Sequence, residues 1–233
     1  MTKKNKSKNK LKKIKEKDKE IETYQKTRKN KYVGKRKEEA DIAQTSMLKN
    51  KEKKESHFQK FYGKNKEGST ETSVLEKIEG KSLDKWIKDK KGKEKNKEEM
   101  INQFAEIAKE LTKKGVTHRD ISPKNMIVKE KGEKPFIKLI DFEKARKTSK
   151  ENFKTEKNMK REMEKLTDTL TATLMKMPQT KYEKIAKTEE KYIPESKMEL
   201  KKKIEEKREE VKEELFEAYE KKIEKMHEKR KTK

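Results

Sequence analysis

Apolar residues recur along this chain with two different periods, and each period predicts its own kind of element. Residues 98–114 have the clearest helical period, and Gly115 is a natural stop for the helix. Its apolar face consists of Met100, Ile101, Phe104, Ile107, Ala108 and Leu111. Residues 157–177 predict a second helix. Its apolar stripe consists of Met159, Met163, Leu166, Leu170, Leu174 and Met177.

The end of the chain predicts a third helix, over residues 196–229, after Pro178 has ended the second. Many Glu and Lys residues in it lie three or four apart, which favours a solvated helix. Its apolar stripe is thin. We expect that stripe to pack along the rest of the fold rather than in a dimer, and we expect a monomer.

Short runs with the period of strands lie between the amino terminus and the second helix. Residues 57–63 alternate apolar and polar side chains, and residues 73–78 form another run. Residues 126–128 and 136–140 are apolar, and the segment between them contains the turn formers Gly132 and Pro135. The last two runs therefore predict a hairpin.

Composition limits how much of the chain a core can hold. Of 233 residues, 49% are charged and 27% hydrophobic, so we expect a lean core in one domain of two small lobes. The net charge is +25, but only seven of the 70 basic residues are arginine. Nucleic-acid sites favour arginine for its planar fork. We therefore attribute the lysine excess to codon bias and rank nucleic-acid binding last.

The cysteine content and the lengths of the apolar runs indicate in which cellular compartment the protein is found. The chain has no cysteine, which excludes disulfides and thiolate metal sites. No apolar run has the length of a membrane span or of a signal peptide core. We expect a soluble, cytoplasmic protein, and delivery into a host cell as an effector stays open.

Residues 1–31 are strongly basic, with 14 Lys or Arg against four Asp or Glu. Leu11, Ile14, Ile21 and Tyr24 fall near helical spacing, but the stripe is thin. We expect a disordered tail or a frayed helix. The functional alternative is electrostatic attachment to an acidic partner.

The chemistry of the chain is concentrated in two stretches, 116–128 and 139–143. They place Asp120, Asn125 and Asp141 at spacings suited to phosphoryl transfer, which requires mainly positioning and charge neutralisation. Asp120 is the candidate for orienting the attacking hydroxyl. Asn125 and Asp141 are candidates for holding Mg²⁺, a hard ion that takes few protein ligands. The predicted hairpin would return Asp141 to the side of Asn125.

His118-Arg119-Asp120 with Asn125, a hairpin and then Asp141-Phe142 resembles the protein kinase superfamily in a divergent, minimal form. Minimal kinases delivered by bacterial pathogens and small atypical kinases of the RIO type are similar. The resemblance implies ATP and Mg²⁺ as cofactors, and an α+β, bilobal kinase-like fold with a reduced sheet in the amino-terminal lobe (N-lobe) and a mostly helical carboxy-terminal lobe (C-lobe). It also implies that His118 and Arg119 shape the catalytic loop (residues 118–125) rather than react.

The resemblance implies four regions of the chain. They are a basic tail at 1–31, a reduced N-lobe at 32–79, a C-lobe at 80–195 and a charged helix at 196–233. Within the N-lobe, residues 32–36 would be a strand and 40–48 a helix.

The resemblance also assigns nucleotide contacts. Lys35 would contact the α- and β-phosphates. Leu75 would lie behind the adenine, and the carbonyl of Glu76 and the N–H of Ile78 would bond its edge. The acidic partner of Lys35 stays open, because Glu39 lies nearby but the usual helix spacing places Gln44 there.

Several features depart from ordinary protein kinases. None of the seven glycines forms G-x-G-x-x-G, and Glu143 replaces the glycine after Asp-Phe. Ser122 stands where these kinases commonly carry a phosphate-contacting lysine, and Lys124 is the candidate substitute. Asp168 is the candidate for bracing the catalytic loop, although we favour a solvated side chain there.

The leading functional hypothesis is a Ser/Thr protein kinase acting on a protein substrate. Only about fourteen residues separate Glu143 from the next helix, so we expect no activation-loop switch. Asp-Phe-Glu raises an alternative, a small-molecule kinase similar to choline or aminoglycoside kinases. The missing glycine-rich loop raises another, a non-catalytic pseudokinase.

Overall fold

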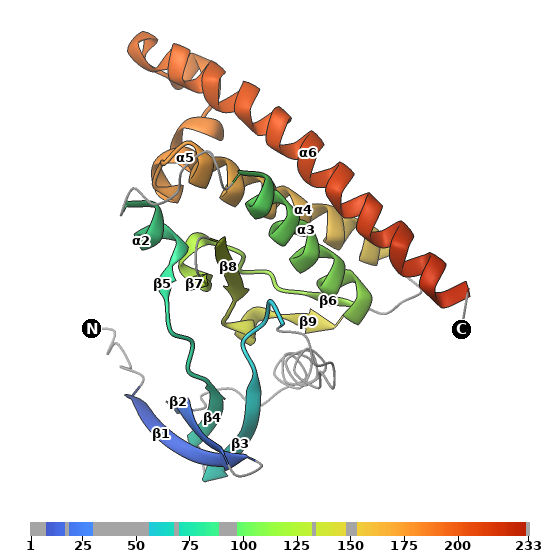
Figure 1. Cartoon of the computed structure of the whole chain (residues 1–233). Helices are drawn as coiled ribbons and strands as arrows, with labels where there is room; N and C mark the ends of the chain where they lie inside the picture. The colour runs from blue at the N-terminus through green and yellow to red at the C-terminus, as the bar shows by residue number, and fades with distance from the viewer. Residues whose placement is uncertain are drawn as a thin grey trace.

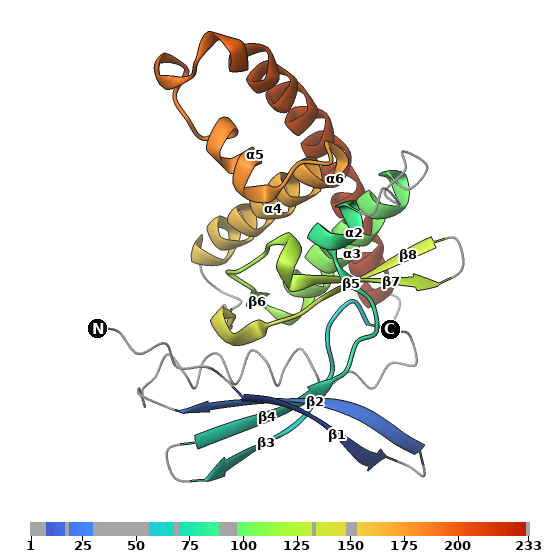
Figure 2. The ribbon, with the colours of Figure 1, turned by 90° about the vertical axis from the view of Figure 1, so that its left-hand side faces the viewer.

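The computed structural model describes residues 8–16, 19–29, 56–67, 70–88, 97–131, 134–147 and 153–231. Its N-lobe contains an antiparallel four-stranded sheet with the order β1-β2-β4-β3 (Figure 1). The strands are β1 (Lys8–Glu16), β2 (Lys19–Lys29), β3 (Phe61–Glu67) and β4 (Thr70–Glu76). The sheet lies below the helical C-lobe, and the two lobes are distinct in both views (Figures 1 and 2).

The expectation of a tail or frayed helix at the amino terminus is wrong for the described residues 8–16 and 19–29, which are strands. Their register places Leu11 opposite Tyr24 and Ile14 opposite Ile21, so the apolar positions match across the pair. β2 also pairs with β4, which gives the hairpin a sheet to join. The predicted strand at 32–36 and helix at 40–48, with Lys35, Glu39 and Gln44, lie outside the described residues.

The C-lobe is mostly helical. Its helices are α2 (Leu83–Lys88), α3 (Lys97–Lys114), α4 (Phe153–Leu174), α5 (Gln179–Ala186) and α6 (Met198–Lys231). Its strands are β5 (Lys81–Ser82), β6 (Val116–Thr117), β7 (Met126–Lys131), β8 (Lys134–Leu139) and β9 (Arg146–Lys147). Short 3₁₀ turns are η2 (Pro123–Asn125), η3 (Phe142–Lys144), η4 (Glu190–Tyr192) and η5 (Glu195–Lys197). The mixed α+β, two-lobed architecture expected from the sequence is confirmed.

The core of the C-lobe is built around α3. Its predicted apolar face is buried, with Phe104, Ile107 and Leu111 fully enclosed. The hairpin of β7 and β8 contributes Met126, Val128, Ile137 and Leu139 to the same cluster. Because α3 leads directly into β6 and the catalytic loop, this packing fixes the loop on a rigid base.

The long helix α6 packs across α3 and α4, as Figure 1 shows. Val211 and Leu215 join the main cluster, and Ile204 joins a second cluster with Tyr182 and Ile185 of α5. The expectation that its apolar stripe packs along the fold is therefore confirmed. The predicted helix at 157–177 ends at Leu174. Pro178 caps the separate helix α5, which the sequence analysis did not predict.

A short extended segment ties the two lobes together. Phe58 forms a parallel bridge with Leu139 of β8. The N–H of Leu139 donates to the carbonyl of His57 at 2.7 Å, and the N–H of Gln59 donates to the carbonyl of Leu139 at 3.1 Å. The strand that ends in the Asp141 segment is thereby anchored on its N-lobe side. No helix within the described residues is long and apolar enough to cross a membrane.

Candidate active site

The β7–β8 hairpin brings Asn125 and Asp141 together, as the sequence predicts. Met126 pairs with Leu139 at its base. Ile140, the residue before Asp141, donates its N–H to the carbonyl of Asn125 at 2.8 Å. The Asn125 side chain donates from Nδ2 to the carbonyl of Asp120, also at 2.8 Å. These bonds join all three candidate residues into one site.

Two residues of the site have left-handed backbone conformations. Arg119 has a φ of 68°, and Asp141 has a φ of 64° and a ψ of 64°. Non-glycine residues reach this region at a cost on the order of 1 kcal/mol, which Asp tolerates better than most. Such strain is concentrated at functional sites. Here it turns the chain immediately before Asp120 and immediately before Phe142.

His118 is a buried, neutral link between the catalytic loop and the Asp141 segment. Its Nε2 donates to the carbonyl of Ile140 at 2.9 Å, and its Nδ1 accepts the N–H of Asp120 at 3.3 Å. This pair of bonds requires one protonated and one unprotonated ring nitrogen. Burial lowers the pKa of His118 to about 4, although the Ile140 carbonyl opposes the shift. The imidazole therefore orients Asp120 rather than transferring a proton.

Phe142 fixes the turn that follows Asp141. Its ring makes edge contacts with Phe58 at 5.4 Å and with His118 at 4.6 Å between ring centroids. All three side chains are buried. These edge contacts connect the N-lobe segment, the Asp141 turn and the catalytic loop, so the position of Asp141 depends on both lobes.

The side chain that braces the catalytic loop is Glu162 of α4. Its Oε2 accepts the N–H of His118 at 3.1 Å, and both of its oxygens accept the N–H of Arg119, at 3.1 and 3.2 Å. Burial raises the pKa of this carboxyl, although the charge of Lys165 and these N–H groups oppose the rise. Lys165 also donates to the carbonyl of Arg119 at 2.9 Å. The sequence analysis missed Glu162.

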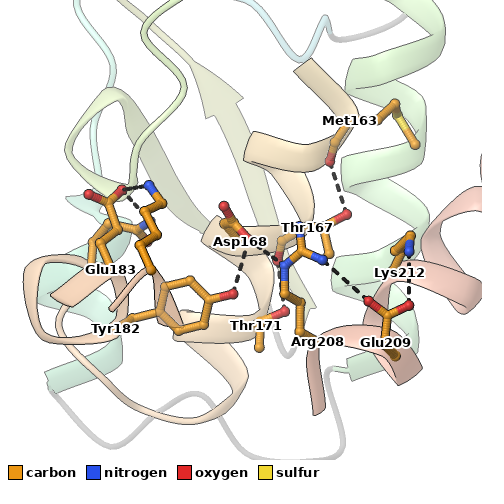
Figure 3. A network of polar contacts seen from close by, with 11 residues as sticks. Met163, Thr167, Asp168, Thr171, Tyr182, Glu183, Arg208, Glu209 and Lys212 are labelled. Carbon is orange, nitrogen blue, oxygen red and sulfur yellow. Dashed lines mark hydrogen bonds and ion pairs between the residues drawn. The ribbon is translucent and has the colours of Figure 1, made fainter. Parts of the chain in front are cut away.

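Asp168, the residue suggested for that bracing role, lies in a different network. Its Oδ1 accepts the hydroxyl of Tyr182 at 3.0 Å and Nε of Arg208 at 2.8 Å (Figure 3). The favoured expectation of a solvated side chain is also wrong, because the Asp168 side chain is 17% exposed. The network joins α4 to α5 and α6, away from the catalytic loop. Its role in the described structure is to hold three helices together.

The cation beside Asp120 is Lys144, which the sequence analysis did not consider. Its Nζ lies 2.9 Å from Oδ2 of Asp120. Burial by itself raises the pKa of Asp120, but the hydrogen bond and charge of Lys144, together with the hydrogen bond of Asn125, hold the pKa below its usual value. Lys124, the candidate from sequence, is exposed on η2. Asp120 is thus an ionised acceptor at neutral pH, as a hydroxyl-orienting carboxylate must be.

The proposed adenine-binding residues lie where β4 runs toward the C-lobe. Leu75 is buried in β4, and Ile78 follows the strand, partly buried. The carbonyl of Glu76 already accepts Nε2 of Gln59 at 2.9 Å. The Glu76 carboxylate pairs with Nζ of Lys138 at 2.7 and 2.9 Å, and the Lys138 side chain is 2% exposed. The adenine contacts of these residues remain predictions, and the ion pair is a feature that sequence did not indicate.

The oxygen ligands available at the site fit magnesium. Asn125 and Asp141 offer an amide and a carboxylate oxygen, the hard ligands that Mg²⁺ prefers. Among the described residues, no three His, Cys, Asp or Glu side chains are grouped as a metal site. Magnesium at a phosphoryl-transfer site needs no such cluster, because phosphates and water complete its shell. Asn125 and Asp141 are the residues that would hold it.

A sequence comparison places this site within a known group of enzymes. The model of the lipopolysaccharide kinase (Kdo/WaaP) family matches residues 58–186, more than half of the chain. The match begins at Phe58 and includes β3, β4, the catalytic loop, the Asp141 segment and α4. A search of curated proteins found no match.

Proposed function

Because the chain belongs to the lipopolysaccharide kinase (Kdo/WaaP) family, we propose that it transfers the γ-phosphate of ATP to a sugar hydroxyl. The observation that carries the proposal is the joint placement of Asp120, Asn125 and Asp141 within the matched region. Kinases of this superfamily use Mg²⁺, and magnesium bound at Asn125 and Asp141 would neutralise charge on the phosphates.

In this reaction the acceptor oxygen attacks the γ-phosphorus, and the bond from that phosphorus to the bridging oxygen breaks, releasing ADP. The acceptor proton passes to Asp120 and then to solvent. Asp120 is held for this role by His118 and Asn125. A positioned carboxylate of this kind contributes roughly 10²- to 10⁴-fold to the rate.

A sugar acceptor is better supported than a protein Ser or Thr. The matched family is named for lipopolysaccharide kinases. Asp-Phe-Glu at residues 141–143 also favours a small-molecule acceptor. We therefore propose the sugar hydroxyl as acceptor, and we keep the absence of an activation-loop switch as part of the proposal.

Transfer of label from γ-³²P-ATP with Mg²⁺ tests the proposal. Purified full-length protein would receive deep-rough lipopolysaccharide in one reaction and casein in another. We expect label on the lipopolysaccharide, and a loss of at least about 100-fold in the Asp120→Asn variant. Glu164→Gln, an exposed carboxylate on the same helix as Glu162, is the matched control and should retain activity.

The outcomes separate the alternatives. Label on casein alone would overturn the sugar acceptor and support a protein kinase. No label on either acceptor, together with no thermal shift on adding ATP and Mg²⁺, would contradict the kinase and favour a pseudokinase.

A further inference from the structure

We propose that Lys144 is a catalytic residue that holds Asp120 toward the acceptor and donates hydrogen bonds to the phosphoryl group in transfer. The inference rests on the proposed function, because it concerns the same reaction. The inference gives Lys144 the role of phosphate-contacting cation, for which the sequence suggested Lys124.

The first support is the fixed position of the Lys144 backbone. Phe142 and Ala145 flank its turn, and both are buried. The N–H of Ala145 closes the turn on the carbonyl of Phe142 at 3.1 Å. Beyond the turn, Arg146 of β9 pairs with Thr117 of β6, three residues before Asp120. The base of the lysine stem is thus held on both sides, next to the catalytic loop.

The second support is where the ammonium group lies. Lys144 begins three residues after Asp141, on the proposed magnesium side, and its Nζ ends 2.9 Å from Oδ2 of Asp120, on the proposed acceptor side. In the reaction, the phosphoryl group must pass between these two carboxylates. The Lys144 side chain therefore runs from the turn after Asp141 to the carboxylate of Asp120.

The third support is the capacity of this ammonium. A lysine has three N–H donors, and the Asp120 carboxylate needs only one of them. The side chain is 66% exposed, so an entering phosphate can reach the other two. Donors aimed at charge that develops during transfer are worth roughly 10²- to 10³-fold in rate.

A surface ion pair formed by chance predicts something different. Exposed pairs contribute little to stability, and removing one leaves the chemistry unchanged. The proposal shares the small effect on stability but requires a large effect on rate. It also requires that Lys144→Arg, which keeps the charge and the N–H donors, restore much of that rate.

The test compares Lys144→Met and Lys144→Arg with Lys147→Met, which changes an exposed lysine of β9. Rates are measured with whichever of lipopolysaccharide and casein the wild type labels. We expect Lys144→Met to lower kcat about 100-fold with the KM for ATP little changed. Lys144→Arg should restore much of the rate, and thermal unfolding should be the same in all variants.

If Lys144→Met matches Lys147→Met in kcat, this inference alone is overturned. The inference is also overturned if Lys124→Met loses kcat and Lys144→Met does not. Wild-type protein that labels neither acceptor would overturn the proposed function and this inference together, so the two failures are distinguishable.

Discussion

The carboxylate of Glu162 accepts the backbone N–H of His118 at 3.1 Å, across 44 residues of sequence. The same carboxylate accepts the N–H of Arg119, whose φ is 68°. A helix of the C-lobe thus holds the strained turn that precedes Asp120. The buried carboxylate stabilises a backbone conformation that the loop would not maintain alone.

Replacing Glu162 by Ala should therefore affect both stability and rate. The N–H groups of His118 and Arg119 would lose their acceptor, which costs about 1–3 kcal/mol in the free energy of unfolding. Because the loop could then relax, kcat should fall by about tenfold or more. Urea unfolding and γ-phosphate transfer measure the two effects. Glu164→Ala is the control for both effects, and Asp168→Asn, whose carboxylate contacts α5 and α6, is a second control for kcat alone. If Asp168→Asn lowered kcat and Glu162→Ala did not, Glu162 would not be the residue that braces the loop.

Acidification should weaken the fold through His118. Its pKa is about 4 in the fold and near 6.5 when unfolded, so the unfolded chain binds more protons between these values. The contribution of His118 to the free energy of unfolding is fully present above pH 6.5. It is lost as the pH falls toward 4, and the loss amounts to about 3 kcal/mol. Urea unfolding at pH 7 and 4.5 should show a smaller loss in His118→Gln than in wild type. Equal losses would mean that His118 is not the neutral link described here.

The Lys138–Glu76 pair should show strong coupling in a double-mutant cycle. Glu76→Gln leaves the ammonium of Lys138 buried without its counter-charge, at a cost of about 3 kcal/mol in stability. Lys138→Met in the same protein removes that charge, so the double variant should lose much less than the sum of the single variants. The exposed pair of Lys203 and Glu199 is the control, for which we expect additivity. Additive losses at Lys138 and Glu76 would contradict the buried pair.

Gly80 should tolerate no side chain. A Cβ there would lie 2.3 Å from the carbonyl oxygen of Val128 and 2.9 Å from Cγ2 of Ile127. Gly80→Ala should therefore push β5 from β7 and cost about 2–4 kcal/mol. Gly63 has a similar φ, +155° against +152°, but nothing within 4 Å of its Cβ position. Gly63→Ala should carry the backbone strain alone, and thermal unfolding that ranked it as the more damaging change would refute this packing.

The parts of the fold that sequence predicted are those with a strong local pattern. The apolar face of α3 and the apolar runs at β7 and β8 are visible in the order of residues. Together they place Asp141 beside Asn125 without further information. The stripe of α6 was predicted for the same reason, since its spacing continues over many turns.

The parts that sequence missed depend on contacts between distant residues. Glu162 and Asp168 lie on one helix, and only the rotation of α4 against the catalytic loop decides which carboxylate faces it. Lys144 is one lysine among many until the left-handed turn at Asp141 directs it to Asp120. Strand β1 pairs with β2, and β2 pairs with β4, which is distant in the sequence and which the basic composition of residues 1–31 does not indicate.

The most direct test of the central claim is transfer of γ-phosphate to deep-rough lipopolysaccharide by wild type, Asp141→Asn and Glu164→Gln. Thermal unfolding without nucleotide should be recorded in parallel to show that each protein is folded. The account predicts label with wild type and Glu164→Gln, and a loss of at least about 100-fold with Asp141→Asn. Undiminished transfer by Asp141→Asn would contradict the mechanism proposed for this site.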